Sequence, residues 1–198
     1  MDVHKRKALL EEAARQIRTG RYGRAAALLK QLSDDDADNA EVRGLKGTLQ
    51  LQLGDLLAAK GIFEGLAMEA IEGQNLQQAE SLLHEYLAVG SQCVPLIALL
   101  ARTYEAKGEL AFAAREYAKA LDKLRGYGAK TVLFDVMFLE TREGDAELAA
   151  ASKRHGNVVH LYTVQPGATE AAPPKVQMPV PVVRASASLL ACPIITDH

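Results

Sequence analysis

The sequence predicts an all-α protein: a right-handed α-solenoid of antiparallel helix pairs, with about nine helices and an irregular C-terminal tail. Three observations support this prediction. The 198 residues are 48% hydrophobic but only 5% aromatic, without Trp, so the apolar content is mostly Ala and Leu, which favour closely packed helices. A pattern of one turn residue and three apolar residues recurs along the chain. Two pairs of its alanines, Ala25 with Ala59 and Ala79 with Ala113, are each separated by 34 residues.

Each copy of the pattern has a turn residue, a large residue two positions later, an alanine three further and a large residue four beyond. Glycine can end a helix in the left-handed conformation, and a small alanine lets two helix backbones approach. The pattern therefore predicts helical hairpins. The copies are Gly20-Tyr22-Ala25-Leu29, Gly54-Leu56-Ala59-Phe63, Gln74-Leu76-Ala79-Leu83, Gly108-Leu110-Ala113-Tyr117 and a weaker Gly144-Ala146-Ala149.

The fourth copy carries a family resemblance. Residues 97–120 follow the pattern I-x-x-L-A-x-x-Y-x-x-x-G-x-L-x-x-A-x-x-x-Y-x-x-A, which resembles the tetratricopeptide repeat (TPR) at its signature positions, with Ile97 in place of the usual Trp. The 34-residue spacing is the period of that family. The resemblance covers about residues 6–155 and implies a TPR-like solenoid over residues 1–156.

The copies depart from a regular array in two ways. Ala59 and Ala79 are only 20 residues apart, so one helix over about residues 56–72 is predicted to serve both as the second helix of one repeat and as the first helix of the next. The terminal copies are degenerate, as expected for repeats that cap an open core. The first has Gln16 where the family usually has Tyr, and the fifth has Glu140 and Lys153 at positions that are normally apolar.

Residues 157–198 differ from the repeats. The run from Val158 to Val164 is rich in β-branched and aromatic residues and predicts a strand, residues 166–174 have the composition of a linker, and the apolar stretch from Val176 to Ile195 is interrupted by prolines and predicts an extended chain. Three interpretations remain open: a disordered tail, a tail docked on the helices of its own chain or a second copy, or a junction to a segment that is missing.

No motif predicts catalysis or a cofactor. The chain lacks GxxxxGK, GxSxG, HExxH and CxxC motifs, and its five histidines are scattered. Two cysteines, Cys93 and Cys192, are too few for a zinc site or a disulfide framework. The acidic run from Asp34 to Asp38 departs from a calcium loop at Asn39 and Leu45, and we interpret it as an inter-repeat loop whose Asp and Asn residues cap the next helix. We therefore expect no enzyme activity, no catalytic residue, no metal and no cofactor.

Charge and hydropathy limit the partners. A net charge of −2 and a pI near 6.2 provide no global basic field, so we expect no nucleic-acid binding. No apolar run reaches the ~20 residues of a membrane span, and the N-terminus lacks the apolar region of a signal peptide. The sequence thus predicts a cytoplasmic protein without membrane insertion.

The TPR resemblance implies a concave groove lined by the first helix of each repeat, which would bind an extended or helical peptide. Co-chaperones of this family that bind a C-terminal carboxylate use Lys and Asn where this chain has Leu10 and Ala14, so we do not expect a carboxylate clamp. The resemblance assigns the family's groove-facing positions to the following residues of this chain: Lys7, Leu10, Ala14, Ile17, Arg18, Thr48, Leu51, Gln52, Met68, Ala98, Arg102, Glu105, Phe134 and Phe138.

The leading functional hypothesis is a non-enzymatic scaffold or adaptor that binds a peptide segment of a partner protein in this groove. One alternative is a chaperone or assembly factor for a secretion or pilus apparatus. Another is a regulatory module whose C-terminal tail occupies the groove. Pairing of two copies into a homodimer also stays open, as do the identity of the partner and the pathway.

Overall fold

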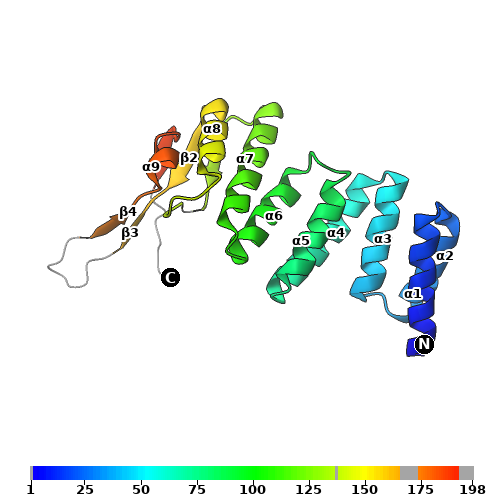
Figure 1. Ribbon diagram of the computed structural model, residues 1–198. Helices are drawn as coiled ribbons and strands as arrows, with labels where there is room; N and C mark the ends of the chain where they lie inside the picture. Colours follow the sequence, from blue (N-terminus) through cyan, green and yellow to red (C-terminus); the bar gives the residue numbers. More distant parts are fainter. Residues whose placement is uncertain (1, 137, 166–173, 192–198) are drawn as a thin grey trace, which may run out of the picture. The chain divides into compact units, whose positions relative to one another are not determined.

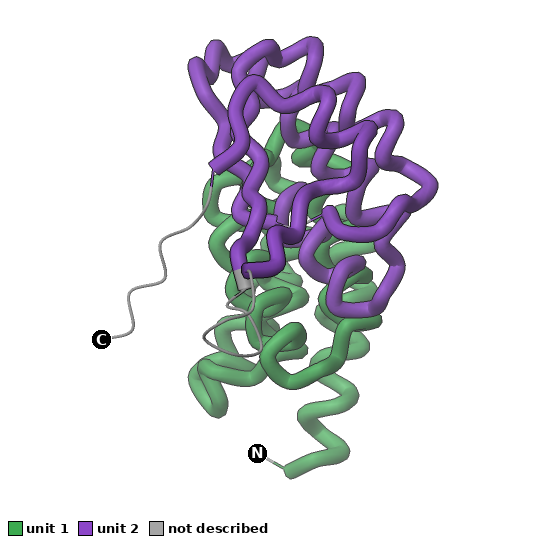
Figure 2. Tube along the Cα trace, turned by 90° about the vertical axis from the view of Figure 1, so that its left-hand side faces the viewer, with its two compact units in different colours: residues 1–96 green, residues 97–198 purple. Residues whose placement is uncertain are grey.

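The computed structural model describes residues 2–136, 138–165 and 174–191 (Figure 1). These residues form two compact units, residues 1–96 and residues 97–198 (Figure 2), and each unit is described by itself. The all-α repeat fold class is confirmed, and the described residues contain nine helices. Cys192 and most of the predicted linker lie outside the described residues.

Unit 1 consists of helices joined by short turns. Its helices are α1 (Val3–Arg18), α2 (Tyr22–Asp35), α3 (Ala40–Leu53), α4 (Leu56–Glu72) and α5 (Leu76–Leu87), and α6 (Val94–Ala106) begins at its end and continues into unit 2. Each helix from α1 to α4 packs against the next one, and α1 also packs against α3. This arrangement places the first helices of the first two repeats side by side.

The repeated residues occupy the places that the pattern predicts. Ala25, Ala59 and Ala79 are fully buried, as expected where neighbouring helices must approach closely. Gly54, directly after α3, has a φ of 78°, a left-handed conformation that glycine adopts without the steric penalty of a side chain. The helical hairpins are thus encoded by these turn and contact residues.

Helix α4 confirms the predicted shared helix. It is a single helix that packs both against α3, which precedes it in the chain, and against α5, which follows it. Phe63 of α4 is fully buried; its ring lies 5.9 Å from the ring of Tyr86 on α5. On the α3 side, a Cβ added to Gly47 would lie 2.9 Å from Phe63 Cε2, so only glycine fits opposite this ring.

The acidic loop between α2 and α3 has the capping role predicted for it. The side-chain oxygen of Asn39 accepts a hydrogen bond of 3.1 Å from the backbone N–H of Val42 in the first turn of α3. Loss of such a cap exposes an unpaired helix N–H.

We therefore expect Asn39→Ala to lower the free energy of unfolding by about 1 kcal/mol, measured by urea denaturation. Asn39→Asp keeps the acceptor and should retain most of the stability. Equal losses in the two variants would contradict a capping role.

Unit 2 combines helices with two small sheets. Its elements after α6 are α7 (Leu110–Gly126), β1 (Val132–Phe134), α8 (Asp145–His155), β2 (Val158–Leu161), β3 (Thr163–Gln165), β4 (Lys175–Gln177), α9 (Pro181–Arg184) and β5 (Leu189–Ala191). Strands β1, β2 and β5 form a parallel sheet in the order β1-β2-β5, and β3 and β4 form an antiparallel hairpin. Helix α8 links β1 to β2 and packs against α7 and α9.

The fifth copy is only half helical. Its second helix is present as α8, but the chain before it, predicted to form a first helix, contains strand β1 instead. Val132, Leu133 and Phe134 are β-branched or large residues that suit a strand, and β1 pairs with β2, whose composition already predicted a strand. The prediction of a helix here is wrong because this pairing satisfies the backbone of residues 132–134.

The described part of the tail is docked on unit 2. Strand β5 pairs with β2, and the backbone N–H of Val180 donates a 2.7 Å hydrogen bond to the carbonyl oxygen of Phe138. The predicted extended conformation holds for β4 and β5, whereas Pro181 begins the short helix α9. Proline is favoured at that first helical position because it needs no N–H partner there.

Candidate functional site

The surface shared by α1 and α3 carries the first set of predicted groove residues. Lys7 and Arg18 on α1 and Gln52 on α3 are exposed, and Thr48 on α3 is half-buried. Because α1 and α3 are in contact, these side chains belong to one continuous part of unit 1. Leu10 and Ala14 of α1 are half-buried, and Met68 of α4 is 48% exposed.

Helix α5 bounds this surface near Thr48. The hydroxyl of Thr48 lies 2.6 Å from Oε1 of Glu85 on α5 and 3.1 Å from the carbonyl oxygen of Gly44. A hydroxyl has one proton, so it donates to one of these oxygens at a time. The shared helix α4 thus brings a carboxylate of α5 to a predicted groove position, a contact that the sequence pattern did not predict.

An ion pair joins α3 to α4. Arg43 and Glu69 form a two-pronged contact in which the guanidinium donates to both carboxylate oxygens. Hydrogen bonding to Arg43 holds the pKa of Glu69 below its ordinary value. Bidentate pairs fix geometry better than single contacts do, so Arg43 and Glu69 orient α3 against α4 beside the predicted groove.

Two predicted groove residues of unit 1 belong to the core. Ile17 and Leu51 are each only 5% exposed, and Ile17 packs in a cluster with Ala13, Ala25 and Leu29. Their apolar side chains are removed from water between helices, where burial stabilises the fold. A ligand would meet the exposed residues on either side of them.

In unit 2, Phe134 and Phe138 lie in an aromatic cluster and not on a surface. They are 7% and 0% exposed, and both contact the rings of Tyr117 and His160. The structure therefore contradicts their placement as groove residues. Because residues 132–134 form a strand, these side chains point into the interface between the sheet and α7.

Arg102 and Glu105 of α6 remain near the surface of unit 2. Tyr117 of α7 donates a 2.9 Å hydrogen bond to Oε2 of Glu105. Burial raises the pKa of Glu105, although this hydrogen bond and the charges of Arg142 and Arg102 act in the opposite direction. Burial next to Glu105 also raises the pKa of Tyr117, so the phenol stays protonated as the donor. Ala98, one turn before Arg102, is half-buried.

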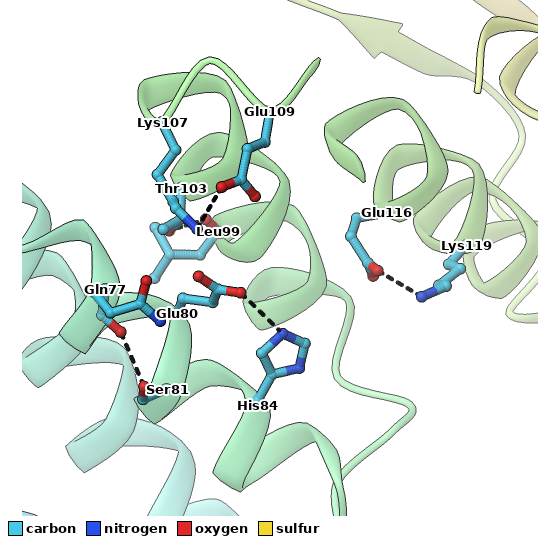
Figure 3. A network of polar contacts seen from close by, with 10 residues as sticks. All are labelled: Gln77, Glu80, Ser81, His84, Leu99, Thr103, Lys107, Glu109, Glu116 and Lys119. Atoms are coloured by element: carbon cyan, nitrogen blue, oxygen red, sulfur yellow. Dashed lines mark hydrogen bonds and ion pairs between the residues drawn. The ribbon is translucent and has the colours of Figure 1, made fainter. Parts of the chain in front are cut away.

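Figure 3 shows local polar pairs on α5 and α7. On α5, the hydroxyl of Ser81 donates to the carbonyl oxygen of Gln77, and His84 lies 3.8 Å from Glu80. On α7, Lys119 donates to Glu116 one turn before it. Exposed pairs of this type on one helix contribute little to stability, although Glu116 itself is only 8% exposed.

The described residues contain no group of three or more His, Cys, Asp or Glu side chains that could hold a metal ion. Cys93 is a half-buried free thiol. His160 is buried among rings, with Ser152 Oγ at 3.4 Å from its Nε2. None of the helices in the described ranges is long and apolar enough to cross a membrane.

Comparison with protein families gives two matches. The model described as "CHASE2 domain" matches residues 62–191, which is more than half of the 198 residues, and a tetratricopeptide repeat model matches residues 16–70. The chain belongs to the CHASE2 domain family and carries tetratricopeptide repeats. The CHASE2 match runs from within α4 to the end of β5 and includes every described strand of unit 2, whereas the repeat match begins in the last turn of α1 and ends within α4.

The tetratricopeptide-repeat resemblance is thereby confirmed, and in general terms the chain is a scaffold for protein interactions. Comparison with the curated proteins gives no match. Among solved structures, a crystal structure of MamA is similar at 15% identity over 68% of this chain and 79% of its own, with a TM-score of 0.34. MamA from Desulfovibrio magneticus RS-1 is similar at 17% identity over 77% and 86%, with a TM-score of 0.33. Likeness of this strength carries no argument about function.

Proposed function

We propose that this CHASE2-family chain is a non-enzymatic scaffold that binds a peptide segment of a partner protein on the α1–α3 surface of unit 1. The observation that carries the proposal is the contact between α1 and α3, which places the first helices of two successive repeats next to each other. Lys7, Arg18 and Gln52 are exposed there.

The chemistry of this surface suits a peptide better than a small substrate. Lys7 and Arg18 supply positive charge, Glu85 supplies a carboxylate, and Leu10 supplies a partly exposed apolar side chain. A mixture of apolar contacts with dispersed polar groups is the usual basis of groove binding by a helix or an extended segment. Sites for small ligands are instead concave and mostly apolar.

One observation argues against the alternative in which the C-terminal tail occupies the groove. Residues 189–191 pair with β2, and Val180 bonds to the backbone of Phe138, so this part of the tail completes a sheet in unit 2. The alternative of a chaperone or assembly factor requires the same peptide-binding surface and differs only in the identity of the client.

The proposal is tested by selecting peptides from a random library on the immobilised full chain and measuring their affinity by fluorescence anisotropy. Lys7→Glu and Gln52→Arg, made one at a time, should each weaken the selected peptides roughly tenfold, a loss of about 1.4 kcal/mol. Both positions are exposed, so the variants should keep the circular dichroism spectrum of the parent.

Lys30→Glu is the matched control, because Lys30 is exposed on α2 and lies outside the predicted groove. Peptides that bind all three variants as tightly as they bind the parent would contradict a site on α1 and α3.

A further inference from the structure

Two adjoining hollows on α1 and α2 form a surface that the groove does not use. One is lined by Gly20, Arg21, Tyr22, Gly23 and Arg24 at the turn between the helices. The other is lined by Glu12, Gln16, Arg24, Ala27 and Leu28 along the two helices. Arg24 lines both, so they form one surface, which we call the α1–α2 hollow.

The hollow lies where another copy of the repeat has aromatic rings. In the fourth copy, Tyr104 lies four residues before the turn glycine and Phe112 lies four after it, and their rings are 5.4 Å apart. The same positions around Gly20 are occupied by Gln16 and Arg24. With no ring at either position, the space next to Ala27 and Leu28 remains open.

Gln16 brings an unpaired polar atom to this hollow. The residue is only 4% exposed, its Nε2 donates to Glu12, and its Oε1 has no hydrogen-bond partner. Glu12 is in turn paired with Arg15. A buried carbonyl oxygen without a partner is costly, so the amide of Gln16 is incompletely satisfied in the wall of the hollow.

The rim of the hollow is strongly basic. Arg21 and Arg24 line it and are exposed, and within the described residues the structure gives their guanidinium groups no ion pair. Arg21 and Arg24 also lie at the start of α2, which has no acidic residue in its first turn. Positive charge is unfavourable at the positive end of a helix dipole, and such a local conflict is typical of a functional surface.

We propose that the α1–α2 hollow binds an acidic segment of a partner protein that carries one apolar side chain between its carboxylates. The apolar side chain packs against Ala27 and Leu28, and the carboxylates pair with Arg21 and Arg24. This site goes beyond the α1–α3 surface, because it uses the loop and the second helix of the first repeat.

The test uses the full chain and a fluorescein-labelled synthetic peptide with one leucine flanked on each side by aspartates. Anisotropy should show saturable binding that weakens as salt is added, since exposed charges are screened. Replacing the aspartates by asparagine, or the leucine by alanine, should each weaken binding roughly tenfold. Equal affinity for the leucine peptide and its alanine analogue would indicate a general polyanion site and would overturn the proposal. The absence of binding at low salt would overturn it as well.

Variants separate recognition from folding. Arg21→Glu with Arg24→Glu places negative charge at the start of α2, where the helix dipole favours it, so the double variant should fold at least as well as the parent and yet lose the peptide. Gln16→Tyr should fill the hollow and weaken the leucine peptide more than its alanine analogue. Lys30→Glu on α2 is the control that should bind normally, and an equal loss with Lys30→Glu would show that only net charge matters. Because the groove variants Lys7→Glu and Gln52→Arg leave the hollow intact, the two proposals can fail independently.

Discussion

Replacing Phe63 by alanine is expected to lower the free energy of unfolding by about 4 kcal/mol, the largest loss that we expect from a single substitution. Phe63 is fully buried on the shared helix α4. Its ring fills the space opposite Gly47 of α3 and contacts Tyr86 of α5. Removing it therefore leaves a cavity that touches three helices, and the interior cannot close around it without moving α4.

The loss is measured by urea denaturation followed by circular dichroism at the helical band. Leu57→Ala on the same helix is the matched control, because Leu57 is 82% exposed and should cost less than about 0.5 kcal/mol. If the Phe63 variant were as stable as the Leu57 variant, α4 would not be the core helix of unit 1.

The shared helix also shows how much of the fold could be predicted from the sequence. The interval of 20 residues between Ala59 and Ala79 is too short for a full repeat, while the residues between them keep a helical period. Only one helix serving two hairpins satisfies both facts, and α4 is that helix. Here local pattern and tertiary packing agree, which is why a pattern of turn and contact residues was sufficient.

Strand β1 shows where the same approach fails. Residues 132–134 are a short apolar run, and periodicity cannot distinguish a buried strand from a helical segment of that length. Residues 132–134 form a strand because they pair with residues 158–160 of β2. Strand β2 in turn pairs with residues 189–191 of β5. Such non-local partners leave no signal in the local pattern of residues 129–143, although the strand-like run from Val158 to Val164 was itself a clue.

The predicted groove residues divide for a related reason. A groove position assigned from the family resemblance predicts which face of a helix a residue occupies, but it does not predict what packs on that face. Lys7 and Gln52 remain exposed, whereas Phe138 is covered once the preceding segment becomes a strand. The contact between Thr48 and Glu85 likewise depends on how the shared helix places α5.

His160 is expected to make the stability of unit 2 depend strongly on pH. Burial among Phe134, Phe138 and the sheet lowers its pKa to about 4, whereas an unfolded chain binds the same proton with a pKa of about 6.5. Between these values the unfolded state holds more protons than the folded state, so the free energy of unfolding falls as the pH decreases from about 6.5 to about 4. The full loss is on the order of 3 kcal/mol, because each pKa unit corresponds to about 1.4 kcal/mol.

The measurement is the free energy of unfolding of the parent and of His160→Phe at neutral pH and at pH values down to about 4. Carboxylates titrate over the same range in both proteins, so the difference between the two curves isolates His160. Nδ1 of His160 has no partner and its ring is parallel to Phe134 at 5.3 Å, so a phenyl ring should replace it at small cost at neutral pH and flatten the curve. Parallel curves for the parent and His160→Phe would mean that this imidazole is solvated in the folded chain and that the aromatic cluster beneath the sheet is open to water.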